Sequence, residues 1–381
     1  MDKIDELLTR GIANIIPSKQ ALEKRLRSDQ KVNAYLGIDT TAPHVHLGNA
    51  FGLRKLQQLV DMGHHVTFLI GDFTTKIGDS SDKESERPIL TDTEIETNFQ
   101  TYKQQVSKIL DFSRVELHHN SEWLSKLTFA DVIKLSQQFT LNDYISREIM
   151  KKKLENGVSI RLDEVLYPLM QGYDSYFMDT DIQVGGADQT FNMQAGRNLQ
   201  KKLRSKDSFV LVGQYLTGTD GRKMSKSWGN AIWLDDTPND IFGKVMSTKD
   251  ELIDEYFTLG TNLPLKDIPK GKSMDRKKKL AWQIVSELHS PTIADMAQAY
   301  FESTFQQKQT PADIPQYHLE KNRSILEVLV GSGLVKSKSE ARRVIEQGGV
   351  KLNQSPVTDF ATEAGPGDLV QVGTRKFVKL T

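Results

Sequence analysis

The feature that most constrains the fold is an alternation of strand and helix patterns between residues 34 and 118. Residues 34–39 (AYLGID) and 66–70 (VTFLI) are short apolar runs with the length of buried strands. Apolar residues between them recur at helical spacing, and a second helical pattern precedes a third strand pattern at 115–118 (VELH). Strands that alternate with helices predict a parallel sheet covered by helices.

The alternation is interrupted by a helical stretch from about 128 to 173, which indicates an insertion into a nucleotide-binding fold. Strand patterns resume at 181–186 (DIQVGG) and 208–216 (SFVLVGQYL). A helical domain is predicted to start near Thr237, which suits an N-cap before Pro238. From about residue 321, two short helical patterns precede several small strand patterns, so a third domain is expected there.

Charge and composition narrow the class of protein. Lysine plus arginine and aspartate plus glutamate both number 50, so no overall field attracts nucleic acid or an anionic membrane. The sequence has no cysteine, which removes disulfides, thiolate nucleophiles and cysteine-ligated metals and favours an intracellular enzyme. Residues 1–17 (MDKIDELLTRGIANIIP) have the pattern of an amphipathic helix rather than of a signal peptide, and no apolar run could span a bilayer. We expect a soluble, cytoplasmic protein without a membrane partner.

Residues 43–50 (PHVHLGNA) follow the first strand and open the first helix. A His-x-His pair can hold a metal, but the local sequence supplies no third ligand. A helix start offers unpaired backbone amides and the positive end of the helix dipole, both of which attract phosphate. Gly48 permits close approach of a ligand, and His46 and Asn49, three apart, can both donate hydrogen bonds to a nucleotide. A surface histidine at a helix start is the simpler alternative.

The second constellation is residues 220–230 (DGRKMSKSWGN). Lys223 and Lys226 are three apart in a loop that also carries glycine and serine. Mobile ammonium groups and hydroxyl donors suit a polyphosphate whose charge grows in a transition state. By composition alone, however, a flexible, solvated basic loop would be the better interpretation.

Together, HLGN on the first helix and KMSKS after a late strand resemble the paired signatures of class I aminoacyl-tRNA synthetases. Further stretches narrow the resemblance to the tyrosyl-tRNA synthetase family, over essentially the whole chain. These stretches are 35–49 (YLGIDTTAPHVHLGN), 71–87 (GDFTTKIGDSSDKESER), 167–174 (YPLMQGYD) and 184–192 (VGGADQTFN). Two positions depart from the family pattern: Asn49 stands where histidine is commoner, and Thr40 stands where proline is usual.

The resemblance implies an α/β fold with three parts. The first is a Rossmann-like, doubly wound parallel-sheet catalytic domain in residues 1–232, with a helical insertion and the KMSKS loop. The second is an all-α anticodon-binding domain in residues 233–318. The third is a small α+β RNA-binding domain in residues 322–381.

The resemblance also implies three sets of site residues. Tyrosine would be bound by Tyr35, Asp39, Thr74, Asp79, Tyr167, Gln171, Asp174 and Gln189, with Tyr35 and Asp174 on the phenol and Asp79 on the ammonium group. ATP would be bound by Gly37, His46, Gly48, Asn49, Gly186, Asp188 and Lys226, with Asp188 on the ribose and Asn49 as a neutral donor. Catalysis would involve Thr41, His46, Asn49, Lys83, Arg87, Lys223, Lys226 and Ser227. Independently, the i, i+4, i+7 spacing of Tyr167, Gln171 and Asp174 predicts that all three project from one helix face.

The C-terminal residues from 321 onward contain ten basic and six acidic residues, so the positive charge missing overall is partly gathered there. Charge alone leaves an RNA-binding module and a structural cap with a solvated face equally open. Residues 333–353 (GLVKSKSEARRVIEQGGVKLN) also resemble the small RNA-binding fold named after a small-subunit ribosomal protein. That resemblance implies phosphate contacts by Lys336, Lys338, Arg342 and Arg343.

The implied reaction is attack of the tyrosine carboxylate on the α-phosphorus of ATP, followed by transfer of tyrosine to the terminal adenosine of tRNA(Tyr). Mg²⁺ is expected as an ion bound to ATP, without a dedicated protein metal site. A homodimer is expected, with its interface on the helical insertion between 128 and 153. The alternatives are tryptophanyl-tRNA synthetase, a free-standing nucleotidyltransferase and a non-catalytic RNA-binding protein derived from a synthetase.

Overall fold

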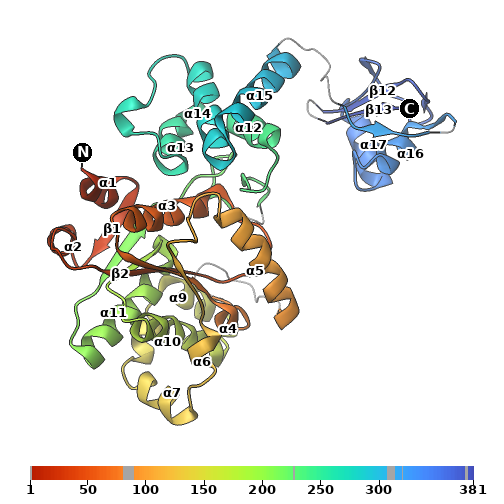
Figure 1. Cartoon of the computed structure of the whole chain (residues 1–381). Helices are drawn as coiled ribbons and strands as arrows, with labels where there is room; N and C mark the ends of the chain where they lie inside the picture. Colours follow the sequence, from red (N-terminus) through yellow and green to blue (C-terminus); the bar gives the residue numbers. More distant parts are fainter. Residues whose placement is uncertain (1, 80–89, 226–227, 307–313, 320, 374–375) are drawn as a thin grey trace. The chain divides into compact units, whose positions relative to one another are not determined.

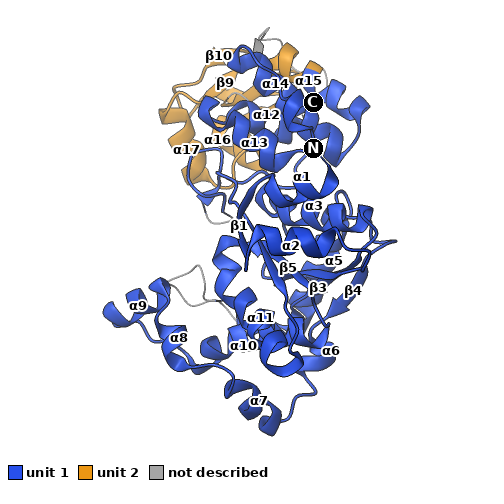
Figure 2. Ribbon diagram, turned by 90° about the vertical axis from the view of Figure 1, so that its left-hand side faces the viewer, with its two compact units in different colours: residues 1–298 blue, residues 299–381 orange. Residues whose placement is uncertain are grey.

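The computed structural model of the chain describes residues 2–79, 90–225, 228–306, 314–319, 321–373 and 376–381 (Figure 1). The chain divides into two compact units, Met1–Gln298 and Ala299–Thr381, which Figure 2 draws in different colours. Each unit has its own sheet and its own buried core. Four residues of the predicted site lie outside the described residues: Lys83, Arg87, Lys226 and Ser227.

A six-stranded sheet forms the centre of the first unit. Its strands are β1 (Ile12–Ile16), β2 (Asn33–Ile38), β3 (His65–Ile70), β4 (Glu116–His119), β5 (Ile182–Gly186) and β6 (Phe209–Gly213), in the spatial order β1-β6-β5-β2-β3-β4. The strands β2 to β6 run parallel, which confirms the predicted class, and β1 is antiparallel to β6 at one edge. The chain proceeds outward from β2 to β4 and then returns beside β2 with β5 and β6, so the sheet is doubly wound.

Helices cover the sheet and explain why its strands read as apolar runs. α3 (Leu47–Asp61) packs against β2, β3 and β5, while α11 (Thr190–Arg204) packs against β5 and β6 (Figure 1). Phe68, Ile70 and Val210 in these strands have no exposed surface. A parallel strand buried on both faces cannot show the alternation of an exposed strand.

The helix α10 (Leu162–Phe177) packs closely along α11 and continues through a proline. Pro168 has no N–H to donate to the carbonyl of Glu164, one turn earlier. That carbonyl instead accepts a hydrogen bond from the Tyr144 hydroxyl at 3.0 Å. At Gly172 an added Cβ would lie 3.1 Å from the carbonyl carbon of Ala195, so glycine is needed for the close approach of the two helices.

The N-terminal segment is only partly the helix that its charge pattern predicts. α1 (Lys3–Thr9) ends before Gly11, whose φ of +64° favours glycine, and β1 follows. Ile12, Ile15 and Ile16 suit a strand because β-branched side chains pack well on a sheet. The prediction of an amphipathic helix is therefore confirmed to Thr9 and wrong beyond it.

The predicted helical insertion is present between β4 and β5. Its helices are α7 (Phe129–Ser136), α8 (Leu141–Ile145) and α9 (Glu148–Glu155), followed by α10. Thr128 caps α7 and accepts from the Asp131 N–H, and the Asp131 carboxylate accepts from the Thr128 N–H in return. The unit also contains α2 (Lys19–Leu26), α4 (Asp72–Thr75), α5 (Asp92–Val106) and α6 (Ser121–Leu124).

The helices after residue 237 belong to the same compact unit as the sheet. They are α12 (Pro238–Met246), α13 (Ile253–Gly260) and α14 (Ser273–Leu288); α15 (Pro291–Phe301) starts in this unit and continues past its last residue, Gln298. Thr237 caps α12 as predicted. Arg10 donates to the carbonyl of Phe257 at 2.8 Å, and Arg54 of α3 pairs with Glu287 at 2.6 Å. These bonds join the part of the unit that contains the sheet to the helices after residue 237. The predicted domain boundary at residue 232 therefore stays a prediction.

The second unit contains two short helices and two small sheets. α16 (Ile325–Gly331) and α17 (Lys338–Glu346) precede the strands β9 to β13, as predicted, but the short strands β7 and β8 come before them; Ser324 and Ser337 cap the two helices. The larger sheet has the order β10-β9-β12-β13-β7: β7 (Gln316–Tyr317), β9 (Val350–Leu352), β10 (Ser355–Pro356), β12 (Leu369–Val372) and β13 (Lys376–Leu380). The smaller sheet pairs β8 (Arg323–Ser324) with β11 (Glu363–Ala364). Across the described ranges, no helix combines the length and the apolar character that crossing a membrane requires.

Candidate active site

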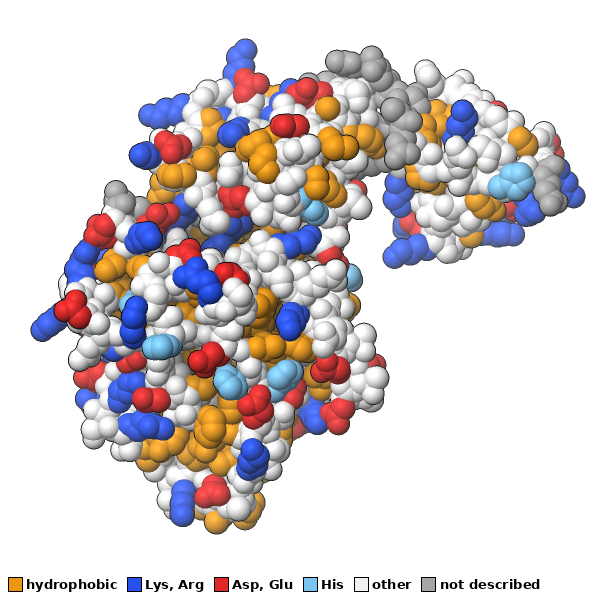
Figure 3. Space-filling model, viewed as in Figure 1, with side chains coloured by type: hydrophobic (Ala, Val, Ile, Leu, Met, Phe, Trp, Pro, Cys, Tyr) orange, Lys and Arg blue, Asp and Glu red, His pale blue; other side chains and the backbone are white. Residues whose placement is uncertain are grey.

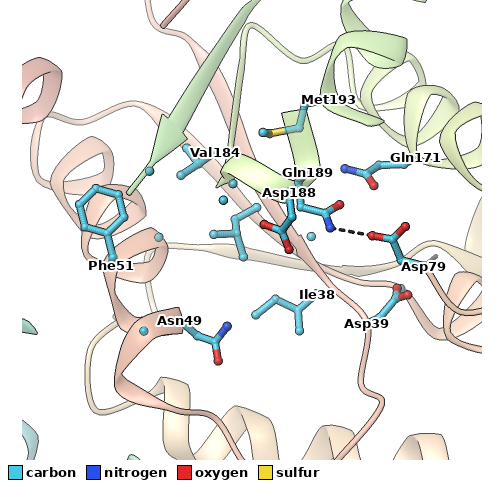
Figure 4. Close-up of a pocket in the computed structure, with 18 of the residues that line it drawn as sticks. Ile38, Asp39, Asn49, Phe51, Asp79, Gln171, Val184, Asp188, Gln189 and Met193 are labelled. Carbon is cyan, nitrogen blue, oxygen red and sulfur yellow. Dashed lines mark hydrogen bonds between the residues drawn. The ribbon is translucent and has the colours of Figure 1, made fainter. Parts of the chain in front are cut away.

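A cavity of about 760 Å³ lies at the carboxyl ends of the parallel strands, where doubly wound sheets bind ligands (Figure 4). It brings together all of the predicted tyrosine, ATP and catalytic residues that the structure describes. These are Tyr35, Gly37, Asp39, Thr41, His46, Gly48, Asn49, Thr74, Asp79, Tyr167, Gln171, Asp174, Gly186, Asp188, Gln189 and Lys223. The i, i+4, i+7 prediction for α10 is confirmed, because Tyr167, Gln171 and Asp174 all line this cavity.

The first motif forms the start of α3. His46 is the N-cap, and its backbone N–H donates to the Asn49 Oδ1 at 3.3 Å, so the side chain of Asn49 completes the capping box. This bond uses the amide oxygen, so the NH₂ group is the part of Asn49 suited to donate to a nucleotide. A Cβ on Gly48 would lie 3.0 Å from the Nδ1 of His46, so glycine at this position leaves space for the imidazole ring.

The first motif is paired directly with the segment that follows the second motif. The Leu47 N–H donates to the Ile232 carbonyl and the Leu234 N–H to the Val45 carbonyl, both at 2.8 Å. The ring of Trp233 lies between the two histidines, with its centroid 5.6 Å from that of His44 and 6.0 Å from that of His46. The two motifs, far apart in sequence, are thus held in one place.

The second motif reaches the cavity through Lys223. Its Nζ lies 3.9 Å from the Asp188 carboxylate and 4.0 Å from the centroid of the Tyr215 ring. The buried side chain of Asn230 organises this loop: its Oδ1 accepts from the Ser225 N–H at 3.0 Å, and its Nδ2 donates to the Lys223 carbonyl at 3.1 Å. Lys223 therefore stands beside the carboxylate that the resemblance assigns to the ribose.

Asp174 forms the buried polar end of the cavity. One carboxylate oxygen accepts from the Trp123 Nε1 at 2.7 Å, and the other accepts from the Asn120 Nδ2 at 3.2 Å. Burial, together with the negative charges of Asp39 and Asp72, raises the pKa of Asp174 to about 7 despite the opposing effect of these two donors. The carboxyl group is therefore held near its point of half-ionisation at neutral pH.

A second carboxylate, Asp39, is bound from two sides. The hydroxyl of Tyr167 donates to one oxygen at 2.9 Å, and the hydroxyl of Thr74 donates to the other at 2.8 Å. Thr74 in turn accepts from Asn120 at 3.0 Å, which joins Asp39 to the hydrogen bonds of Asp174. Burial, followed by the charge of Asp39, raises the pKa of Tyr167 well above its usual value, so Tyr167 is a neutral donor.

A third carboxylate, Asp79, faces the same space (Figure 4). Gln189 Nε2 donates to it at 2.7 Å, the bond drawn in the figure, and Gln171 of α10 lies nearby. Asp188 points into the cavity next to Gln189, and a Cβ on Gly186 would lie 2.6 Å from its Oδ1. The cavity thus offers four carboxylates, those of Asp39, Asp79, Asp174 and Asp188, together with a lysine, a histidine and a helix start. Such a site can bind an ammonium group, a sugar and a polyphosphate together.

Thr40 departs from the family pattern at the turn after β2. Its side chain is fully buried, and its backbone N–H donates to the Thr75 Oγ1 at 3.1 Å. Proline could not make this bond, because it has no N–H. A hydrogen bond therefore holds this turn at the position where the family usually has the ring of a proline.

The sequence did not point to Asn120 and Gln183, two polar residues that line the cavity, or to Trp123, which binds Asp174. Gln183 lines the cavity from β5, and Asn120 and Trp123 follow β4. A signal for Asn120 was available, since polar residues after the carboxyl end of a parallel strand commonly reach the ligand edge. The available sign for Gln183 was a polar residue between the apolar Ile182 and Val184, but neither motif includes it.

In the second unit three of the four predicted basic residues lie on one helix. Lys338, Arg342 and Arg343 are exposed on α17, Lys336 is exposed just before it, and Ala341 and Ile345 are buried on its other face. The basic residues are therefore available to solvent, and the helix is held by its apolar side.

Comparisons with known proteins agree with this geometry. Residues 27–306 match the family described as tRNA synthetases class I (W and Y), and residues 323–370 match the S4 domain. The chain is 39% identical to a tyrosine–tRNA ligase of Dehalococcoides mccartyi, covering 99% of this chain and 98% of the relative. It is 41% identical to a tyrosine–tRNA ligase of Carboxydothermus hydrogenoformans, covering 98% of this chain and 97% of the relative.

Solved structures share the fold. A C-terminally truncated mitochondrial tyrosyl-tRNA synthetase of Aspergillus nidulans gives a TM-score of 0.67 at 22% identity, covering 80% of this chain and 94% of that one. A tyrosyl-tRNA synthetase of Archaeoglobus fulgidus complexed with L-tyrosine gives a TM-score of 0.61 at 21% identity, covering 78% of this chain and 100% of that one. These likenesses confirm the predicted catalytic fold.

Proposed function

Because the chain belongs to the family of class I tRNA synthetases for tryptophan and tyrosine, we propose that its reaction is the ligation of tyrosine to tRNA. The enzyme activates L-tyrosine with ATP and transfers the tyrosyl group to the 3′ adenosine of tRNA(Tyr). The observation that carries this choice is the buried polar end of the cavity. Tyr35 and Asp174, both at most 3% exposed, offer hydrogen-bonding groups there to a phenol.

In the first step, a carboxylate oxygen of tyrosine attacks the α-phosphorus of ATP. The bond between the α-phosphorus and the bridging oxygen to the β-phosphorus breaks, and tyrosyl-adenylate and pyrophosphate are formed. Both nucleophile and leaving group are already anionic, so no residue needs to remove a proton. Catalysis then consists of positioning and of stabilising charge on the pyrophosphate.

The phosphates face the cationic side of the cavity. His46, the amides at the start of α3 and Lys223 supply donors there, and Thr41 lines the same wall. The resemblance adds Lys83, Arg87, Lys226 and Ser227, which lie outside the described residues. Asp188 accepts hydrogen bonds from the ribose hydroxyls, a task for which its carboxylate beside Gly186 is suited. Lys223, within 3.9 Å of Asp188, moves from this carboxylate to the phosphates when ATP binds.

Tyrosine binds between the carboxylates of the cavity and Tyr35. Asp79, Tyr167 and Gln171 hold its ammonium group, while Tyr35 and Asp174 contact its hydroxyl. Phenylalanine in the same place would leave the buried groups of Tyr35 and Asp174 without a partner, which is costly. Such a site rejects phenylalanine without an editing domain; this enzyme class is the standard example of the effect.

Mg²⁺ enters the site with ATP. Among the described residues, no group of three or more histidine, aspartate or glutamate side chains could hold a metal ion. An Mg²⁺ ion that arrived with ATP would be held by phosphate oxygens and water, with the carboxylates of the cavity as further oxygen ligands within reach of its chemistry. When bound, the ion neutralises part of the phosphate charge.

In the second step, a ribose hydroxyl of the terminal adenosine attacks the tyrosyl carbonyl, and AMP leaves. The tRNA is also held by the S4-like second unit, through phosphate contacts of Lys336, Lys338, Arg342 and Arg343. The helices α12 to α15 correspond to the anticodon-binding domain of the resemblance. The reaction takes place in the cytoplasm, where the absence of cysteine from the sequence fits a reducing environment.

The enzyme works as a homodimer whose interface lies on the helical insertion. Phe129 is 81% exposed, Leu141 61% and Leu162 78%, all within or beside the helices α7 to α10. Figure 3 shows hydrophobic side chains among the charged ones at the end of the first unit that carries α7. Large apolar side chains gathered on one face mark an interaction surface, and two copies joined there would cover it.

The direct test is exchange of labelled pyrophosphate into ATP with tyrosine, tryptophan or phenylalanine. We expect exchange with tyrosine alone and its loss in Asp174→Ala. Asp207→Ala is the control, because Asp207 is exposed and pairs only with a surface lysine at 2.9 Å among the contacts of the described residues. Exchange with tryptophan would overturn the substrate assignment, and no exchange with any of the three would favour a non-catalytic RNA-binding protein.

A further inference from the structure

Gln183 is a polar residue inside the sheet to which neither motif of the sequence draws attention. It lies in β5 between Ile182 and Val184, lines the cavity and is 1% exposed. A buried amide costs free energy unless its donors and acceptor find partners. The partners of Gln183 therefore indicate what it is for.

The side-chain amide is hydrogen bonded at both ends. Its Nε2 donates to the carbonyl of Met193 at 2.8 Å, and its Oε1 accepts from the hydroxyl of Tyr35 at 3.2 Å. A carbonyl can only accept, so the nitrogen must face Met193 and the oxygen must face Tyr35. The backbone of α11 thus sets the orientation of the amide.

Packing leaves the amide little alternative. Tyr35 and Gln183 are register partners in the neighbouring strands β2 and β5, so their side chains project on the same face. On the α11 side, Gly196 provides the space: a Cβ there would lie 2.8 Å from the Gln183 Oε1. The amide is therefore held between the sheet and α11.

This orientation decides what Tyr35 can offer to a ligand. A phenol has one proton, and Tyr35 donates that proton to Gln183, which leaves only oxygen lone pairs for the cavity. The carboxylate of Asp174, at the same end, accepts from Asn120 and Trp123. When Asp174 is ionised, this end of the cavity therefore presents only acceptors, and a ligand must bring the proton.

We propose that Gln183 is a positioning residue for amino-acid selection: by accepting the Tyr35 proton, it makes the cavity select a ring whose para substituent donates a hydrogen bond. The proposal rests on the proposed function, to which it adds the residue Gln183 and the direction of the hydrogen bond between Tyr35 and the ligand. It predicts that the unmodified enzyme prefers tyrosine, and then 4-aminophenylalanine, over 4-fluorophenylalanine, which has a similar size but no proton to donate.

The test compares kcat/KM for tyrosine and for 4-fluorophenylalanine in pyrophosphate exchange. Gln183→Met keeps the volume and removes the acceptor, so the Tyr35 proton becomes free to turn towards the cavity. We expect the ratio of the two kcat/KM values to fall about tenfold, the effect of one ordinary buried hydrogen bond. In a Tyr35→Phe background the same substitution should change the ratio by less than about twofold, because Gln183 acts through Tyr35.

Gln200→Met is the matched control. Gln200 is also fully buried and donates to a backbone carbonyl, that of Ser175, at 2.8 Å, but it is not among the described residues that line the cavity. Gln200→Met should lower thermal stability without changing the ratio of kcat/KM for tyrosine to kcat/KM for 4-fluorophenylalanine. Gln183→Asn, whose shorter side chain can keep only one of the two bonds, should lower the ratio and serves if Gln183→Met does not fold.

An unchanged ratio in Gln183→Met, or an equal fall in Gln200→Met, would overturn the proposal and leave Gln183 a structural residue. Failure of the proposed function is distinguishable, because it would appear as no tyrosine-dependent exchange in the unmodified enzyme.

Discussion

Replacing Trp123 by phenylalanine removes one hydrogen bond from the Asp174 carboxylate and keeps the packing around it. The Trp123 Nε1 donates to Asp174 at 2.7 Å, and the indole stacks on Phe177 with ring centroids 4.6 Å apart. Phenylalanine retains an aromatic face for the stacking but has no donor. Burial holds the pKa of Asp174 at about 7, and the Trp123 bond lowers it, so losing the bond raises this pKa.

The size of the shift follows from the strength of the bond. A hydrogen bond to a charged group contributes about 1.5–3 kcal/mol, and one pKa unit corresponds to about 1.4 kcal/mol. The pKa of Asp174 in Trp123→Phe should therefore rise by about one to two units. If the ionised carboxylate accepts the substrate proton, its fraction at pH 7 falls from about one half to between about one tenth and one hundredth. The value of kcat/KM for tyrosine at pH 7 should then fall about 5- to 50-fold.

The assay is tyrosine-dependent pyrophosphate exchange measured from pH 6 to pH 10. The rising limb of kcat/KM reports the free enzyme, and it should move upward by about one to two pH units in Trp123→Phe. Trp282→Phe is the control, because it loses the same type of bond, from Nε1 to Asp295 at 2.7 Å, outside the cavity. A limb that stays in place, or that moves equally in the control, would refute this account of Asp174.

Four further predictions concern other parts of the molecule. Lys223→Ala should lower kcat for pyrophosphate exchange about 100-fold with little change in KM for tyrosine, because Lys223 acts on the phosphates. Asp174 has a folded pKa of about 7 against a usual value of 3.8, so its burial costs stability as the pH rises through that interval; thermal unfolding should show Asp174→Asn gaining more stability, relative to the unmodified enzyme, at pH 8 than at pH 5. Arg342→Ala combined with Arg343→Ala should weaken tRNA binding and reduce its salt dependence by about one unit of slope per lost contact, while tyrosine-dependent exchange stays unchanged. Phe129→Asp should halve the mass measured by sedimentation, and an unchanged mass would place the dimer interface elsewhere.

The sequence was informative where structure is local. The strands β2, β3, β5 and β6 contain short apolar runs, and the helices between the strands show apolar spacing and caps, so the parallel sheet could be predicted from short windows. The strand β1 could not, because its stability depends on β6, about 200 residues away in the chain. Gly11 was the available local sign that α1 ends.

The site divides in the same way. The resemblance over several short stretches predicted Tyr35, Asp174 and the other active-site residues, and the spacing along α10 predicted one shared face; the described ones line the cavity. Only the tertiary structure decided which donors and acceptors these groups can offer. The residue that accepts the Tyr35 hydrogen bond, Gln183, is 148 positions away, and the donors to Asp174 lie at the N-cap of α6 and within that helix, more than 50 positions away. The hydrogen-bonding state of a buried side chain is set by the neighbours that folding brings to it. The residues next to it in the sequence do not determine which neighbours these are.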